Sequence, residues 1–275
     1  MKQLAILLAT YNGARYLRPL LDSLFAQTEK RWTLYVHDDG SADETLDILN
    51  AYAAAHPNMV LLDYPPTGGA KNNFLSLLER TAADFYMFCD QDDVWAEHKV
   101  ERTLEKMLEA EEQFSAATPI VVHCDLFVTD EGLNVTSPSF WQCEHIDALR
   151  EPTFTQLAAC NLLTGCAMML NAAAKVVVPT SAPQAKMHDA WIAACVVWKK
   201  GKIIPIAEPL IYYRQHGGNV LGVNSETLGQ KLQHVRRVFA DNAAQFRMMN
   251  AAGHISVAAY VWAKLRYLIR KHTSR

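Results

Sequence analysis

The sequence of 275 residues lacks several features that would place it directly in a large protein class. No stretch reaches the roughly 18 unbroken apolar residues that a membrane-spanning helix requires. Its six cysteines are scattered without CxxC spacing, which argues against a zinc site or a disulfide framework and favours free thiols in a reducing compartment. The net charge of −3 gives no reason to expect a nucleic-acid partner. We therefore expect a cytoplasmic globular protein.

Apolar runs of strand length alternate with segments of helical periodicity through the first part of the chain. The expected strands cover residues 4–9, 32–36, 59–62, 85–89 and 120–124. This alternation predicts an α/β fold with a single doubly wound, mostly parallel sheet and helices on both of its faces. Polar loops follow strands one, two and four, and such sheets bind ligands at the carboxyl ends of their strands. The three loops should therefore converge on one site.

The pattern is less regular after residue 125. Residues 127–155 are expected to form an irregular excursion that covers the site, while 203–206 and 210–213 are expected as two short strands. Ser41 and Glu44 fit a capping box for the second helix. The expected organisation is one domain over 1–222, with halves at 1–125 and 126–222, and a helical tail over 223–275.

Three carboxylates, Asp90, Asp92 and Asp93, follow the fourth expected strand within four positions. Like charges this close repel one another unless a cation or solvent compensates them. Mg²⁺ and Mn²⁺ prefer oxygen ligands, and they also accept the oxygens of a diphosphate. The cluster therefore indicates either half of a metal–diphosphate site or an acidic turn that caps the next helix.

An ordered series of motifs resembles the family-2 inverting glycosyltransferases, which have a nucleotide-diphospho-sugar-binding fold of A type. The later motifs are similar to the rhamnosyltransferase-like branch of bacteria, which builds surface polysaccharides. The resemblance covers about residues 3–220, and although each motif is weak alone, their order makes the series specific. The motifs are Ala9-Thr10-Tyr11-Asn12-Gly13, Asp38-Asp39-Gly40-Ser41, Asp90-Gln91-Asp92-Asp93, Thr164-Gly165, His188-Asp189-Ala190-Trp191 and Gln215-His216-Gly217-Gly218-Asn219.

The resemblance implies a nucleotide-sugar site in the half 1–125. Asp39 would accept a hydrogen bond from the N3–H of a pyrimidine base. Asp90 and Asp92 would hold a divalent cation, Mg²⁺ or Mn²⁺, and His216 would complete its ligands. Gly217 and Gly218 would let their loop order over the donor. The remaining expected contacts of the nucleotide sugar are Thr10, Tyr11, Asn12, Lys71, Asn73, Asp90, Gln91 and Arg214.

The same resemblance implies an acceptor site in the half 126–222. Inversion by direct displacement needs a carboxylate that takes the proton of the acceptor hydroxyl, and Asp189 is the expected general base. Asp189 also fits an N-cap, and the two roles are compatible. Thr164, Gly165 and His188 would lie beside the acceptor. Trp191 would stack on a sugar ring or belong to the core.

The tail is basic and amphipathic. Val257, Val261, Leu265, Leu268 and Ile269 recur at helical spacing, with Lys264, Arg266, Arg270 and Lys271 between them. Such a helix suits the anionic inner face of a membrane, where a lipid-linked acceptor would be found. The alternatives are that the helix packs on its own domain or on a second subunit in a homodimer.

The expected activity is metal-dependent transfer of L-rhamnose from dTDP-rhamnose to a polysaccharide or a lipid-linked oligosaccharide. A UDP-hexose donor, carrying galactose or glucose, is the alternative within the family. A sugar-nucleotide pyrophosphorylase shares the sheet but needs a basic glycine-rich loop, which Thr10 to Gly13 do not provide. A catalytically inactive scaffold subunit would be favoured by loss of the acids, and these are present. The enzyme would work in the cytoplasm or on the inner face of the membrane.

Overall fold

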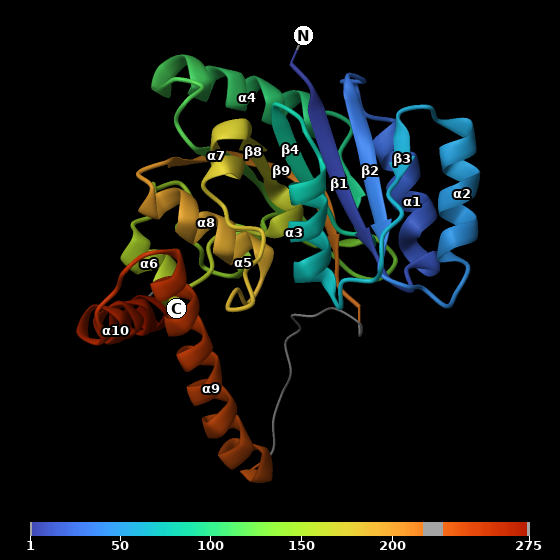
Figure 1. Ribbon diagram of the computed structural model, residues 1–275. Coiled ribbons are helices and arrows are strands. Elements are labelled where there is room, and N and C mark those ends of the chain that lie inside the picture. The colour runs from blue at the N-terminus through green and yellow to red at the C-terminus, as the bar shows by residue number, and fades with distance from the viewer. Residues whose placement is uncertain (1, 217–227, 274–275) are drawn as a thin grey trace.

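A mixed sheet organises the protein, whose computed structural model describes residues 2–216 and 228–273 (Figure 1). The strand order is β3-β2-β1-β4-β8-β6-β9-β5, and β7 pairs with β6. The strands are β1 (Leu4–Thr10), β2 (Trp32–Asp38), β3 (Met59–Leu61), β4 (Phe85–Cys89), β5 (Val94–Trp95), β6 (Ile120–Thr129), β7 (Val135–Ser137), β8 (Met168–Asn171) and β9 (Lys202–Arg214). The helices are α1 (Ala14–Phe25), α2 (Thr45–Ala55), α3 (Ala70–Arg80), α4 (Lys99–Phe114), α5 (Phe140–Cys143), α6 (Phe154–Ala159), α7 (Ala172–Val176), α8 (His188–Trp198), α9 (Leu228–Ala252) and α10 (Val257–Thr273), with a 3₁₀ turn at Gly165–Ala167.

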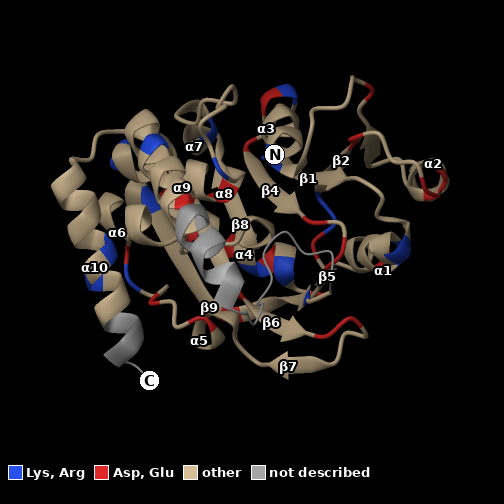
Figure 2. Cartoon of the chain, turned by 90° about the horizontal axis from the view of Figure 1, so that it is seen from below, with Lys and Arg blue, Asp and Glu red and all other residues tan. Residues whose placement is uncertain are grey.

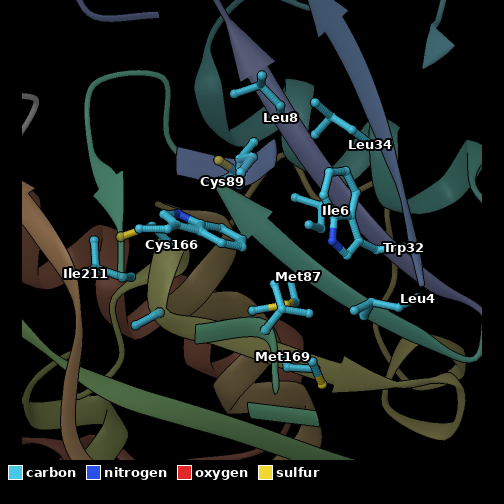
Figure 3. Packing of buried hydrophobic residues seen from close by; sticks show 14 of the residues in the cluster. Leu4, Ile6, Leu8, Trp32, Leu34, Met87, Cys89, Cys166, Met169 and Ile211 are labelled. Atoms are coloured by element: carbon cyan, nitrogen blue, oxygen red, sulfur yellow. The ribbon is translucent and has the colours of Figure 1, made fainter. Parts of the chain in front are cut away.

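The first four strands form the parallel part of the sheet. β1 pairs in parallel with β2 and β4, and β2 pairs in parallel with β3. β1 is apolar from Leu4 to Ala9 because both of its faces are covered: Leu4, Ile6 and Leu8 enter one core cluster, while Ala5 and Leu7 enter the other. Figure 3 shows the first of these clusters around β1 and β2.

Helices cover both faces of this sheet. α1, α2 and α4 supply the cluster that contains Leu4, and α3, α6 and α8 supply the cluster that contains Ala5. The four buried leucines of α1 recur at helical spacing, which gives this helix one continuous apolar face toward the sheet; they are Leu17, Leu20, Leu21 and Leu24. The prediction of a mostly parallel sheet with helices on both faces is confirmed.

The second half of the sheet contains antiparallel pairings. β8 is antiparallel to both β4 and β6, whereas β9 runs parallel to β6. The prediction of two strands at 203–206 and 210–213 was wrong, because both segments belong to one long strand, β9. Its pairing with β6 shifts register on both sides of Asp125, and the strand thereby continues through residues 207–209. Residues 127–155 are also more regular than expected, since they complete β6, pair β7 with it and form α5.

The capping box predicted at Ser41 and Glu44 is absent from the second helix. α2 begins at Thr45 and has no side-chain cap, because the Ser41 hydroxyl instead donates to Asp38 at 2.6 Å. This bond draws Ser41 into the loop that follows β2 and away from the helix.

Two C-terminal helices, α9 and α10, follow the sheet domain, as predicted. Met248 and Met249 of α9 and Tyr260 of α10 are buried in the core cluster that also contains α8. Among residues 2–216 and 228–273, no helix is both long enough and apolar enough to span a bilayer.

Candidate functional site

A cavity of about 660 Å³ opens where the carboxyl ends of β1 and β4 meet the segment before α8. This is the sheet edge at which the polar loops after strands one, two and four were predicted to converge. Of the predicted residues, the cavity is lined by Thr10, Tyr11, Asn12, Asp39, Asn73, Asp90, Gln91, Asp92, Thr164, Gly165, His188, Asp189 and His216. Lys71, Trp191 and Arg214 do not line it, and Gly217, Gly218 and Asn219 lie outside the described residues.

Hydrogen bonds fasten the loop after β1 to the loop after β2. The Thr10 hydroxyl donates to the Asp38 carboxylate at 2.8 Å, and the backbone N–H of Asn12 donates to the Ser41 hydroxyl at 2.7 Å. Asn12 has a φ of 47°, a left-handed conformation that asparagine tolerates better than most residues. Its side-chain oxygen also accepts the Ala42 N–H at 2.8 Å. The two loops therefore form one rigid wall that leaves Tyr11 exposed at the mouth of the cavity.

Asp39 organises a second loop, over residues 67–69. Its carboxylate accepts the Thr67 hydroxyl at 2.9 Å, the Gly69 N–H at 2.6 Å and the Gly68 N–H at 3.3 Å, and it also accepts the Thr67 N–H. Burial opposes ionisation of this side chain, but the hydrogen bonds prevail and hold the pKa of Asp39 below its ordinary value. The side chain is therefore an anion that shapes the cavity wall.

Asn73 lines the cavity and belongs to a buried hydrogen-bonded cluster with His37. The Asn73 side chain bonds the His37 ring at 2.9 Å and donates to the His37 carbonyl at 3.0 Å. The Tyr64 ring stacks on His37 at 3.5 Å between centroids. Lys71, in contrast, reaches toward the Ala182 carbonyl at 3.4 Å, because its position on α3 turns it away from the cavity. The prediction that Lys71 contacts the donor is corrected accordingly.

Gln91 connects the loop after β4 to the loop after β1. Its side-chain amide accepts the Tyr11 N–H at 2.9 Å and donates to the Tyr11 carbonyl at 3.0 Å. A Cβ on Gly13 would lie 2.6 Å from the Gln91 Cδ, so position 13 requires glycine for this contact. Gln91 thus positions Tyr11 as well as lining the cavity.

The three carboxylates after β4 occupy different environments. Asp90 and Asp92 line the cavity, whereas Asp93 is fully buried behind it. Burial raises the pKa of Asp90 to about 7, and the neighbouring charges of Asp92 and Asp189 add to the effect. Burial, then the charges of Asp92 and Asp90, raises the pKa of Asp93 well above its ordinary value. Burial and mutual repulsion therefore oppose the simultaneous ionisation of these carboxyl groups, a cost that a bound cation would relieve.

Residues from the end of β9 hold this acidic loop. The Arg214 N–H donates to Asp93 at 3.1 Å, and the Arg214 Nε donates to the Asp92 carbonyl at 2.8 Å. Arg214 is buried and does not line the cavity, so the prediction that it contacts the nucleotide sugar is corrected to a role in positioning the loop. The His216 Nε2 lies 2.8 Å from the Asp92 carboxylate, and its ring packs on Tyr16 at 4.7 Å.

Asp189 reaches the same cavity from the opposite half of the sheet, at the start of α8. Its carboxylate accepts the Ala190 N–H at 2.6 Å and the Asn161 side-chain amide at 2.9 Å. Burial raises the pKa of Asp189 to about 6, although both hydrogen bonds act in the opposite direction. A carboxylate in this state can accept a proton near neutral pH. Asn161 was not predicted, because only the fold brings it to Asp189.

The floor of the cavity at Thr164 and Gly165 rests on His188. A Cβ on Gly165 would lie 2.7 Å from the His188 Cε1, so only glycine fits over this ring. His188 is enclosed by Phe74 and Phe88, with ring centroids at 4.3 and 5.0 Å. Burial lowers the pKa of His188 to about 3, and the ring is therefore neutral. His188 supports the cavity floor from below.

Trp191 lies in the core and not in the cavity. Its side chain is fully buried, and its indole N–H donates to the Pro179 carbonyl at 2.8 Å. Trp191 belongs to the core cluster that α8 shares with α3 and α6, and it therefore cannot stack on a sugar. Of the two predicted roles of Trp191, the structure therefore agrees with membership of the core.

A buried lysine behind the acids was also not predicted. Lys99 donates to the Cys166 carbonyl at 2.8 Å, and its ammonium lies 2.9 Å from the centre of the Trp95 ring. Burial lowers the pKa of Lys99 to about 8. From the sequence, Lys99 resembled any basic residue in the first turn of an amphipathic helix.

The acid cluster fits a divalent cation. Ligand atoms of Asp90, Asp93 and Cys166 lie within 4.8 Å of one another, and the Asp93 Oδ2 has no hydrogen-bond partner within the described part of the chain. Of the three predicted metal ligands only Asp90 belongs to this group, because the side chains of Asp92 and His216 bond each other at 2.8 Å. Burial raises the pKa of the Cys166 thiol well above its ordinary value, so oxygen atoms dominate this donor set. Carboxylate oxygen donors suit Mg²⁺ or Mn²⁺.

Comparison with solved structures gives the same fold. The S. aureus TarS fragment 1–349 in complex with UDP-GlcNAc superimposes with a TM-score of 0.60 at 16% identity, covering 98% of this chain and 72% of that one. The mannosyltransferase PcManGT from Pyrobaculum calidifontis, in complex with GDP-Man and Mn²⁺, gives a TM-score of 0.58 at 16% identity, covering 96% and 72%. The similarity establishes the architecture shared with A-type glycosyltransferases.

Sequence comparison identifies relatives over shorter spans. The glycosyltransferase alr2836 of Nostoc sp. is 25% identical over 79% of this chain and 66% of its own. The dTDP-rhamnosyl transferase RfbG of Shigella flexneri is 30% identical over 36% of this chain and 36% of its own. The protein named "Putative teichuronic acid biosynthesis glycosyltransferase TuaG" of Bacillus subtilis is 30% identical over 40% of this chain and 44% of its own. The chain thus spans between about a third and two thirds of the length of these relatives. The model of the family Glycosyl transferase family 2 matches residues 5–173, more than half of the sequence, and the chain therefore belongs to this family.

Proposed function

We propose that the protein is an inverting glycosyltransferase that uses a nucleoside-diphospho-sugar donor, with dTDP-L-rhamnose as the donor. One observation carries the proposal: Asp90 and Asp189, from opposite halves of the sheet, face the same cavity closely enough for the charge of Asp189 to raise the pKa of Asp90. A diphosphate site and a proton acceptor thereby share one space. The relative from Shigella supports the rhamnosyl donor.

The donor's nucleotide would lie between Tyr11 and Asp39. Tyr11 offers an exposed aromatic face at the cavity mouth, on which a base can stack. Asp39 is ionised, and within the described residues its Oδ2 accepts one N–H, that of Gly69, so it can accept the N3–H of thymine or uracil as well. Because both bases carry this N–H, a UDP-hexose remains the alternative donor.

The acidic loop would receive the diphosphate through a divalent cation, held by Asp90 and Asp92 with His216 beside them. When bound, Mg²⁺ or Mn²⁺ supplies positive charge that stabilises the departing nucleoside diphosphate. Arg214 and Gln91 keep the loop in position by binding its backbone and that of Tyr11. These contacts make the site preorganised.

Asp189 would act as the general base toward the acceptor. The acceptor hydroxyl oxygen forms a bond to the anomeric carbon, the bond from that carbon to the phosphate oxygen breaks, and the hydroxyl proton passes to the Asp189 carboxylate. The electron pair of the broken bond leaves on the diphosphate. Displacement from the side opposite the leaving group inverts the anomeric centre.

The acceptor would be a saccharide or a lipid-linked oligosaccharide of a surface polysaccharide. It would approach over the floor formed by Thr164 and Gly165, on the side of Asp189. With a lipid-linked acceptor the enzyme would work in the cytoplasm at the inner face of the membrane, and the basic tail is the segment that suits such contact.

The test is a panel of donors measured with purified protein. We expect isothermal titration with dTDP and UDP, each with and without Mn²⁺, to show metal-dependent binding, and we expect turnover with dTDP-rhamnose above that with UDP-glucose, UDP-galactose, UDP-GlcNAc or GDP-mannose. Asp92→Asn should remove the metal-dependent part of binding. Asp189→Asn should retain donor binding and reduce turnover by about 10²- to 10⁴-fold.

Glu112→Gln provides the control, because it removes an exposed carboxylate from α4, far from the cavity. It should match the original protein in both measurements. Binding that ignores Mn²⁺ and survives Asp92→Asn would contradict the diphosphate site. Preference for a UDP-hexose would transfer the assignment to the alternative donor.

A further inference from the structure

The exposed face of α10 is the surface feature that the proposed chemistry leaves unexplained. One side of this helix packs on the domain: Tyr260 and Ala263 are buried, and the Tyr260 hydroxyl donates to the Asn242 carbonyl at 3.0 Å. The other side leaves large apolar residues in contact with solvent, namely Val257, Val261, Trp262, Leu265 and Leu268, with exposures of 64, 49, 61, 47 and 50%. We call these five residues the α10 stripe.

The geometry of the stripe suits a planar apolar phase. At 3.6 residues per turn, its five members span an arc of roughly 140°. Lys264 lies at one border of this arc and Arg266 at the other, while the buried residues occupy the opposite side. Helices that lie in a membrane interface combine such an apolar arc with basic residues beside it. The tryptophan at the edge is also typical of the headgroup region.

The charge of the chain is also distributed unevenly between the tail and the sheet domain. Residues 231–275 contain nine lysines and arginines against the single acid Asp241, a formal charge of +8, and since the whole chain carries −3, residues 1–230 carry −11. α10 contains no acidic residue, and Figure 2 shows basic segments along it. An anionic surface would therefore attract the tail and repel the sheet domain, which orients the molecule.

A second cavity, of about 640 Å³, lies at the Arg266 border of the stripe, between α10 and the segment around α6. Its lining combines cations with aromatic rings, including Arg150, Arg266, Trp262 and Tyr267. Among the described residues, no acidic side chain lies within ion-pair distance of Arg266, whereas Arg150 pairs with Asp147 at 3.6 Å, and Asp147 is the acidic residue in the lining of this cavity. Two guanidinium groups over such a hollow suit the phosphate of a lipid headgroup.

This second cavity adjoins the proposed catalytic cavity through one short segment. Cys160 and Leu162 line the second cavity, and Asn161 between them binds Asp189. A molecule held at the α10 border would thus reach the acceptor side of the active site.

We propose that the α10 stripe docks on an anionic lipid surface and that the adjoining cavity receives a lipid phosphate through Arg150 and Arg266. Docking of the stripe does not depend on the proposed function. The role of that docking, which is to present a lipid-linked acceptor to Asp189, rests on the proposed function. A second copy of the chain fits the stripe less well, because a twofold contact would bring Lys264 and Arg266 of both copies together.

The experiment is co-sedimentation of the full chain with vesicles of phosphatidylcholine, with and without phosphatidylglycerol. We expect binding to the anionic vesicles that weakens with salt. Leu265→Glu should reduce the partition coefficient at least about tenfold, because it places a charge in the stripe. Arg150→Gln and Arg266→Gln should each reduce it about fivefold on anionic vesicles only.

Leu108→Glu is the matched control, since Leu108 on α4 has a similar exposure of 43% but lies outside the stripe. It should bind vesicles like the original protein. Glycerol phosphate at millimolar concentration tests the source of the phosphate: competition for vesicle binding would assign the cavity to any phosphate monoester and overturn its selectivity for a lipid. Donor titration with Leu265→Glu separates the two proposals, because its nucleotide binding should not change.

Two results would overturn the inference. One is equal sedimentation of the original protein and Leu265→Glu with anionic vesicles. The other is a concentration-dependent dimer in sedimentation velocity that Leu265→Glu abolishes, which would assign the stripe to a second subunit.

Discussion

Asn161→Ala tests whether the Asn161 side chain tunes the proposed general base. The Asn161 amide donates to the Asp189 carboxylate at 2.9 Å and therefore favours its ionised form. Hydrogen bonds to charged groups contribute about 1.5–3 kcal/mol, and one pKa unit corresponds to about 1.4 kcal/mol. Water that enters the vacated space recovers part of this energy. We therefore expect the substitution to raise the pKa of Asp189 by about one unit.

The sign of the effect on activity follows from the role of the base. Asp189 must be ionised to accept a proton, so kcat/KM should fall as the pH drops through the pKa of Asp189, which burial raises to about 6. In Asn161→Ala this acid limb should move to higher pH by about one unit. At high pH the two proteins should converge, because Asp189 is then ionised in both.

The assay is the pH dependence of kcat/KM for sugar transfer, at a fixed concentration of Mn²⁺. Gln156→Ala is the control, because Gln156 caps α6 in the same segment through a 2.8 Å bond with the Thr153 N–H and does not touch Asp189. It should change stability and leave the acid limb in place. An acid limb at the same pH in Asn161→Ala and the original protein would refute the reasoning.

Two further substitutions test the walls of the cavity. Gly165→Ala should destabilise the protein by about 1–3 kcal/mol in urea unfolding, because the new methyl group overlaps the enclosed His188 ring; the double variant with His188→Ala should recover part of this loss, and strictly additive effects would disprove the contact. Asp39→Asn should weaken binding of the nucleoside diphosphate about tenfold or more in calorimetric titration, because an amide NH₂ cannot accept the N–H groups of the loop over 67–69. Unchanged affinity would show that this loop does not shape the nucleotide site.

The sequence predicted the parallel half of the sheet because its local and global signals agree there. Leu4 to Leu8 are apolar without interruption, and a strand with that pattern must be covered on both faces. The order of strands and polar loops then placed Thr10, Asp39 and Asp90 at one edge. The antiparallel half was harder to predict, because β9 continues through residues 207–209 by an irregular pairing with β6 that has no local signature.

The side-chain types of the site were readable from the sequence, but the directions of the side chains were not. Lys71, Trp191 and Arg214 carry groups that suit a sugar or a phosphate, and the side chain of each makes a hydrogen bond to a carbonyl of the protein itself. The contribution of Asn161 depends on a contact with a residue 28 positions away. Such contacts follow from how packed elements meet and not from spacing along the chain.

The sequence by itself determined the fold class, the family resemblance and the acidic character of the site, because these depend on hydrophobic periodicity and on residue chemistry along the chain. Only the tertiary structure decided which acids face the cavity, which lysine lies buried behind them, and which side of α10 remains exposed. Burial and distance set the pKa of a carboxylate and the partner of an apolar face, and both quantities exist only once the elements have packed.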